Sequence, residues 1–77
     1  MSERYGKMRE WLIKLRKKAN KTQEQVADLA RISRPTYTRI ETGERNPSVD
    51  IAKKIALVLE FDWVRFYESE VKENERI

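Results

Sequence analysis

The apolar residues of this sequence recur at the spacing of amphipathic helices, and five helical segments account for the pattern without a strand. In the first segment, apolar side chains stand at positions i, i+3, i+4 and i+7, namely Met8, Trp11, Leu12 and Leu15. This spacing places them on one face of a helix over about residues 7–18. The segments are joined by short connections, as is normal for a compact bundle. We therefore predict an all-α fold.

Residues that cap helices mark where the second and third segments begin. Thr22, followed three positions later by Gln25, has the pattern of a capping box and predicts the start of the second helix. The apolar side of that helix consists of Val26, Ala27, Leu29 and Ala30. Ser33 and Gly43 suit the start and the end of a third helix, and Pro35 is tolerated in its first turn.

Two more helices complete the predicted bundle. Ser48 is the cap expected for a fourth helix over residues 49–60, which follows a loop marked by Pro47. Asp62 would cap a fifth helix that begins at Trp63.

Composition limits the chemistry that the protein can perform. A chain of 77 residues makes one domain, residues 1–77, with a core at about residues 7–67 and a charged C-terminal tail at residues 68–77. It has no Cys, no His and only two Gly residues, so a cysteine nucleophile, the commonest general base, the commonest metal ligand and a phosphate-binding glycine loop are missing. We therefore expect no enzyme activity, no metal and no cofactor. Without a signal peptide or a membrane-spanning apolar run, we expect a cytoplasmic protein with no membrane partner.

The net charge of +4 is distributed unevenly along the chain. Residues 1–54 carry 14 basic and 7 acidic side chains, a net charge of +7, and residues 55–77 carry 3 basic and 6 acidic ones, a net charge of −3. A basic part beside an acidic part is typical of a protein that binds a polyanion. A solvated helix face explains a basic run equally well, so the charge does not decide between the two readings.

The block from Gln23 to Gly43 contains the strongest functional signal. Ala27 is small enough for a second helix to approach closely, and the turn at residues 31–33 is too short for antiparallel packing. Two helices joined in this way meet at a large angle. This is the geometry of a helix-turn-helix, which binds the DNA major groove with its second helix.

In order and spacing, these residues resemble the Xre family of Cro- and lambda-repressor-like DNA-binding proteins, from about residue 12 to residue 67. The matching elements are Leu15-Arg16, Thr22-Gln23, Val26-Ala27, Ile32-Ser33-Arg34, Arg39-Ile40-Glu41 with Gly43, and Arg45-Asn46-Pro47-Ser48. The resemblance implies a compact five-helix lambda-repressor-like bundle. Arg31 departs from the pattern, because the family commonly has Gly there and often a positive φ, which would cost Arg about 1 kcal/mol. This departure indicates either an altered turn or an additional basic contact near DNA.

The resemblance also implies which residues contact DNA. The N-terminal half of the third helix would read base edges, through Arg34, Pro35, Thr36, Thr38 and Arg39. Arg can donate two hydrogen bonds to guanine, and Thr offers a hydroxyl and a methyl group to a base. Phosphate groups would be bound near the start of the second helix and in flanking segments, by Lys17, Lys18, Lys21, Thr22, Gln23, Tyr37, Arg45 and Asn46. Thr22 also suits a cap, and Tyr37 also suits core packing.

Two further sets have structural roles in this interpretation. Arg16 and Glu41 would form an ion pair between the first and third helices, as the resemblance implies. The fourth helix is apolar over about half of its circumference, more than one core contact requires. Since the family pairs through its C-terminal helices, we expect a homodimer interface formed by Ile51, Val58, Trp63 and Phe66.

Together, these features predict a sequence-specific transcriptional regulator that binds an inverted-repeat operator in double-stranded DNA. It would be a repressor of prophage or controller type, open to control by a separate regulatory protein partner. The alternative is a protein-interaction module, such as an antitoxin or anti-regulator that uses the face of the fourth and fifth helices. The basic and polar character of the third helix favours the DNA-binding regulator over the protein-interaction module. An RNA-binding or DNA-coating protein is disfavoured because the aromatic stacking platform is missing.

Overall fold

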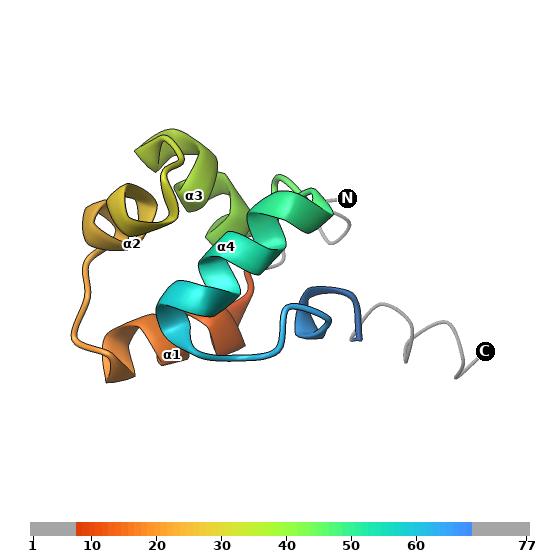
Figure 1. Cartoon of the computed structure of the whole chain (residues 1–77), viewed down its shortest axis with the longest axis horizontal. Helices are drawn as coiled ribbons and strands as arrows, with labels where there is room; N and C mark the ends of the chain where they lie inside the picture. The colour runs from red at the N-terminus through yellow and green to blue at the C-terminus, as the bar shows by residue number, and fades with distance from the viewer. Residues whose placement is uncertain (1–7, 69–77) are drawn as a thin grey trace.

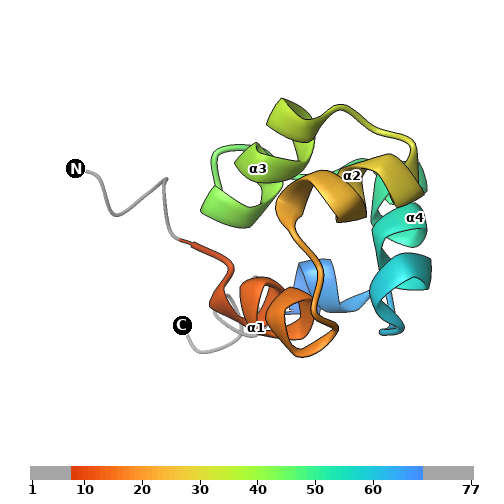
Figure 2. The same ribbon diagram turned by 90° about the vertical axis from the view of Figure 1, so that its left-hand side faces the viewer.

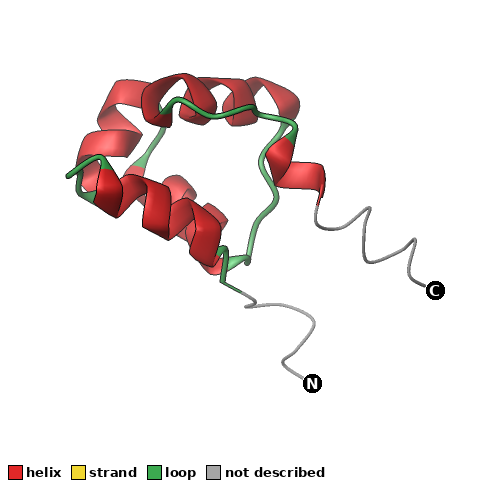
Figure 3. Cartoon of the chain, turned by 90° about the horizontal axis from the view of Figure 1, so that it is seen from below, coloured by secondary structure: helices red, strands yellow, loops and turns green. Residues whose placement is uncertain are grey.

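Four α-helices follow one another in the computed structural model, which describes residues 8–68 (Figure 1). Their bounds are Glu10–Lys18 for α1, Gln23–Ala30 for α2, Arg34–Thr42 for α3 and Val49–Leu59 for α4. A final helical stretch covers residues 65–68, and no strand occurs among the described residues (Figure 3). The all-α fold with five helical segments is therefore confirmed. None of the helices in this part of the chain has the length and apolar character needed to cross a bilayer.

Helix α1 begins at Glu10, later than predicted, because Arg9 ties the preceding chain to α3. The backbone N–H of Arg9 donates to the carbonyl oxygen of Glu41 at 2.8 Å. The Arg9 guanidinium donates to the carbonyl oxygen of Ile40 at 2.6 Å. Met8 consequently lies outside the helix and is 51% exposed, so the prediction that it shares the apolar face of the helix is wrong.

Side-chain caps begin the later helices, as predicted. Thr22 Oγ1 accepts a hydrogen bond from the N–H of Gln25 at 3.1 Å, and Gln25 Oε1 accepts one from the N–H of Thr22 at 2.8 Å. This reciprocal pair is the capping box. Ser33 and Ser48 cap α3 and α4 with their hydroxyls. Asp62 accepts from the N–H of Val64, but the final helical stretch begins at residue 65, two residues later than predicted.

Three helices end on a residue with a positive φ. Gly43 ends α3 with φ 86°, as predicted. Helix α4 ends at Leu59, one residue before the predicted end, and Glu60 follows as its cap with φ 63°. Arg31 ends α2 with φ 63°, so the turn keeps the conformation that glycine adopts most easily. The alternative of an altered turn is therefore wrong, and Arg31 carries the steric cost of about 1 kcal/mol.

The hydrophobic core forms where α2 packs against both α3 and α4, with α1 beneath them (Figure 2). Its fully buried side chains come from all four helices: Leu12, Val26, Tyr37, Ile40 and Ile55. Leu29 is 58% exposed, so its predicted place on the apolar side of α2 is wrong.

An aromatic cluster closes the core next to α1. The rings of Trp11 and Phe66 lie 5.3 Å apart between centroids, and those of Phe61 and Phe66 lie 5.6 Å apart. Phe66 is 3% exposed as a result. The prediction that Phe66 belongs to a dimer interface is therefore wrong, because this side chain fills the core of its own chain.

Candidate functional site

Helices α2 and α3 are held together across the turn at residues 31–33. The N–H of Ile32 donates to the carbonyl oxygen of Ala27 at 3.0 Å, which folds the turn back onto α2. The side chain of Ala27 is 1% exposed, so its small size is used for close packing. The helix-turn-helix expected from the sequence is thus present, with α3 at an outer side of the bundle (Figure 2).

The outward face of α3 carries the predicted base-reading residues. Arg34, Pro35 and Arg39 are exposed, and Thr36 and Thr38 are partly exposed. An open depression on this face is lined by Arg34, Pro35, Thr38, Arg39, Thr42 and Glu44. Four of the five predicted base-reading residues therefore lie together; Thr36 stands at the start of the helix beside its cap.

The two arginines of this face are weakly held. The side chain of Arg34 makes no hydrogen bond or ion pair with another residue of the described part of the chain. Arg39 Nε lies 4.0 Å from Glu44 Oε1, and both side chains are more than half exposed. An exposed pair of this kind contributes at most about 1 kcal/mol. Both guanidinium groups can therefore turn toward a ligand at little cost.

The threonine hydroxyls of α3, in contrast, are engaged within the protein. Thr36 Oγ1 accepts from the hydroxyl of Ser33 at 2.8 Å, and Thr42 donates to the carbonyl oxygen of Arg39 at 3.1 Å. Thr38 Oγ1 lies 3.4 Å from Gln23 Oε1, toward which it donates.

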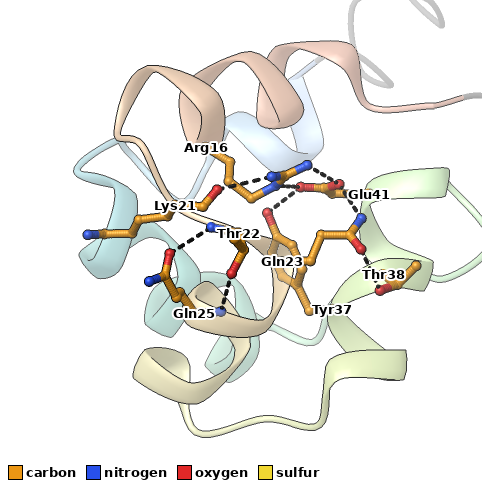
Figure 4. Close-up of polar contacts among 8 residues, drawn as sticks. All are labelled: Arg16, Lys21, Thr22, Gln23, Gln25, Tyr37, Thr38 and Glu41. Atoms are coloured by element: carbon orange, nitrogen blue, oxygen red, sulfur yellow. Dashed lines mark hydrogen bonds and ion pairs between the residues drawn. The ribbon is translucent and has the colours of Figure 1, made fainter.

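On its inward face, α3 buries the carboxylate of Glu41, which is 1% exposed. Arg16 donates from Nε to Glu41 Oε2 at 2.6 Å and from Nη2 to Oε1 at 3.3 Å (Figure 4). The Tyr37 hydroxyl donates to Oε2 at 2.6 Å, and Gln23 Nε2 donates to Oε1 at 2.9 Å. The expected ion pair between Arg16 and Glu41 is present, and it forms part of a larger polar network that links α1, α2 and α3.

The pKa of Glu41 reflects a balance of opposing effects. Desolvation by burial raises it, but the hydrogen bonds from Arg16, Tyr37 and Gln23 together lower the pKa below its ordinary value of 4.5. The pKa of Arg16 is raised, chiefly by its hydrogen bond to Glu41. Burial, and then the hydrogen bond to Glu41, raises the pKa of the Tyr37 hydroxyl. The carboxylate is thus ionised and fully paired.

Tyr37 was predicted both as a core residue and as a phosphate ligand. Its side chain is 0% exposed, and its hydroxyl is directed to Glu41. The phosphate prediction is wrong for Tyr37, because a fully buried hydroxyl cannot reach DNA. The sequence did not identify Tyr37 and Gln23 as partners of Glu41; for Tyr37, the i, i+4 spacing on one helix was the available signal.

The remaining predicted phosphate ligands fall into two groups. Ahead of α2, Lys17 and Lys18 are exposed, Lys21 is partly buried, and Thr22 uses its hydroxyl in the capping box. Gln23, the first residue of α2, is also partly buried. After α3, the exposed Arg45 and Asn46 lie in a loop that Arg9 holds, since Arg9 donates to Asn46 Oδ1 at 2.7 Å and to the Arg45 carbonyl oxygen at 3.2 Å. No local pattern indicates this role of Arg9, because it lies more than 30 residues from its partners.

The outer side of α4 carries the other predicted interface. Ile51, Val58 and Trp63 are partly buried and pack against the core, so only part of each side chain is accessible. Leu57, which was not among the predicted interface residues, is 80% exposed. It borders an open groove lined by Lys53, Ala56, Leu57, Glu60, Phe61, Asp62 and Trp63.

Comparison with known proteins gives consistent results. Residues 12–66 match the family described as helix-turn-helix. A Bacillus subtilis (strain 168) protein, the uncharacterized HTH-type transcriptional regulator YqaF, is 49% identical over 72 residues, which are 90% of this chain and 95% of YqaF. The cryptic phage CTXphi transcriptional repressor RstR of Vibrio cholerae serotype O1 is 44% identical over 54 residues, which are 70% of this chain and 48% of RstR. No solved structure matches the chain significantly.

Proposed function

The chain belongs to the helix-turn-helix family of DNA-binding transcriptional regulators, and from this premise we propose that α3 reads base edges in the major groove of double-stranded DNA. The observation that carries the proposal is the outward face of α3, where Arg34 has no partner among the described residues and Arg39 has only a weak one. Each Arg that donates two hydrogen bonds to guanine discriminates against a wrong base by about 1–3 kcal/mol. The base-reading set is Arg34, Pro35, Thr36, Thr38 and Arg39.

Phosphate groups on either side of α3 would be bound by the two groups of flanking residues. The first backbone N–H groups of α2 and the positive end of its dipole attract a phosphate, and Thr22 supports this end as its cap. The lysines that precede α2 add positive charge, and the loop after α3 adds two more polar groups. The set is Lys17, Lys18, Lys21, Arg45 and Asn46, with Gln23 contributing its backbone N–H, because Glu41 and Thr38 engage its side-chain amide.

Two copies of the chain would bind the two halves of an inverted-repeat operator. The likeness to RstR, a phage transcriptional repressor, supports a cytoplasmic repressor of prophage or controller type. Leu57 is 80% exposed on α4 and shares a groove with Trp63, and together with the partly buried Ile51 and Val58 it supports pairing at this surface. In a twofold dimer, the two α3 helices would enter successive major grooves about 34–36 Å apart.

Selection of bound sequences from random duplexes, followed by a salt titration, tests this function. We expect an inverted repeat to be enriched. Arg34→Ala should relax the preference at one base position of each half-site, whereas Lys54→Ala, which removes the same charge from α4, should leave the motif unchanged. If no sequence is enriched, or if the two variants behave alike, base reading by α3 is wrong.

Sedimentation tests the dimer separately. At micromolar concentration, we expect a mass above that of one 9.3 kDa chain. Leu57→Asp should reduce this mass to that of one chain, because a buried charge in a small apolar interface is costly. A single-chain mass for the unchanged protein would contradict pairing through α4.

The exposed Leu57 and its groove also favour the second candidate function, a protein-interaction module such as an antitoxin or anti-regulator. In that case, the α4 side would bind a different protein, and DNA binding would be secondary. A separate regulatory partner could use the same groove. The two candidates differ in the selection experiment, since this one predicts no enriched motif.

A further inference from the structure

Between its two arginines, the depression on the outward face of α3 is lined by Pro35 and by two threonines, Thr38 and Thr42, whose hydroxyls donate within the protein. We propose that Thr38, beside Pro35, recognises the C5-methyl group of a thymine by apolar contact, and not by a hydrogen bond from its hydroxyl. The inference rests on the proposed function and specifies the operator: each half-site contains a thymine whose methyl group Thr38 contacts.

The hydroxyl of Thr38 is directed toward α2. It lies 3.4 Å from Gln23 Oε1, on the neighbouring helix (Figure 4). The acceptor is itself fixed, because Gln23 Nε2 donates at 2.9 Å to Glu41, whose carboxylate is buried and ionised. A threonine Cβ carries only a hydroxyl and a methyl group. With the hydroxyl toward α2, the methyl group is the part of this side chain that remains to meet a ligand.

The neighbours of Thr38 have the same character. Pro35 is exposed, has no N–H and carries only a hydrocarbon ring. The Thr42 hydroxyl donates to a backbone carbonyl oxygen within α3. Along the depression that these residues share, the groups left to donate hydrogen bonds are the guanidinium groups of Arg34 and Arg39. In the major groove, thymine is the base with a methyl group, so an apolar patch between two guanidinium groups suits thymine.

The test uses the most enriched duplex from the selection and copies in which single thymines are replaced by uracil, which lacks only the C5-methyl group. At one thymine in each half-site, we expect uracil to weaken binding about fourfold, as for one methyl group removed from a buried contact. Thr38→Val retains the methyl group and should keep this uracil penalty. Thr38→Ser retains the hydroxyl and should bind thymine and uracil duplexes equally. Thr42→Ser, the matched loss of a methyl group one turn later, should keep the penalty.

The possible results separate the inference from the function on which it rests. If the unchanged protein enriches no motif, the proposed function fails and the inference fails with it. If a motif is enriched but no thymine is sensitive to uracil, the inference alone is overturned. It is also overturned if Thr38→Ser keeps the uracil penalty or if Thr38→Val abolishes it. Melting temperatures of the three variants identify any result that stems from lost folding, and uracil substitution in the unchanged protein decides the question without a variant.

Discussion

Helix α3 has two faces that differ in almost every physical respect. The inward face places Tyr37, Ile40 and Glu41 against the rest of the protein, with no more than 1% of any of these residues exposed. The outward face exposes Arg34 and Arg39, which no close contact holds in place. One helix of nine residues therefore combines a fully paired buried charge with two guanidinium groups that are available to a ligand.

This difference indicates that one set of α3 side chains contributes to stability and another to DNA recognition. Substitutions on the inward face should change the free energy of unfolding, and those on the outward face should change DNA binding. Gln23 and Thr38 stand at the border, since their contact joins the buried network to the outward face. The separation can be tested from both sides.

The largest effect is expected from Glu41→Ala. Removal of the carboxylate leaves Arg16 without its ion-pair partner in a site where its side chain is 12% exposed. We expect the free energy of unfolding to fall by about 3–5 kcal/mol, as when one partner of a buried pair is deleted. Thr42→Ala, the matched change at the next position, should cost no more than about 1 kcal/mol. Urea denaturation measures both losses, and equal losses for the two variants would refute the structural role of Glu41.

The same carboxylate predicts a dependence of stability on pH. The pKa of Glu41 is lowered on folding, so its contribution is fully present above the ordinary value of 4.5 and is lost as the pH falls through the lower folded pKa. We expect the melting temperature to decrease in that acid range. Glu41→Gln cannot titrate at this position and should lose less stability over the same range. Parallel losses in the two proteins would show that other carboxyl groups are responsible.

On the outward face, Arg34→Ala should weaken DNA recognition and have little effect on stability. We expect a loss of about 1–3 kcal/mol in discrimination at one base position, because the bidentate contact is removed. The free energy of unfolding should change by no more than about 0.5 kcal/mol, since Arg34 is exposed and makes no polar contact with another described residue. Binding titrations against matched and mismatched duplexes, together with urea denaturation, provide the two readouts. A large loss of stability would break the separation of the two faces.

Local features of the helices were predicted better than the contacts between helices. Caps such as Thr22 and Ser33 were predicted correctly, because a cap depends on residues only three positions away. The Arg16–Glu41 pair came from the family resemblance, and the other partners of Glu41 were missed. A hydrogen bond such as that between Gln23 and Glu41 joins residues 18 positions apart, and only the packing of α2 on α3 brings them together.

Periodicity failed where a distant contact decided the outcome. Met8 has the correct spacing for α1, but the hydrogen bonds from Arg9 to α3 hold the chain out of the helix. Phe66 was assigned to an interface because the C-terminal part contains many apolar residues. Spacing alone could not show that Trp11 and Phe61 would enclose it.

The smallest effect is expected at Arg31, an exposed residue in the turn that precedes α3. Its backbone conformation lowers stability, and its charge lies close to the outward face of α3. Its φ of 63° is unfavourable for a residue with a Cβ, and Arg31→Gly should raise the free energy of unfolding by up to about 1 kcal/mol. If its charge contacts a phosphate, the same variant should bind DNA more weakly. The slope of the logarithm of the binding constant against the logarithm of the salt concentration should then be smaller in magnitude by about one.

Glu60 is the matched control, because it also has a φ of 63° but ends α4. Glu60→Gly should gain stability for the same steric reason without weakening the affinity for DNA. A gain in stability for both variants, with weaker binding for Arg31→Gly alone, would mean that the turn retains a strained arginine for recognition. If Arg31→Gly leaves the affinity for DNA and its salt dependence unchanged, Arg31 does not contact DNA. Its unfavourable backbone conformation would then make no contribution to binding.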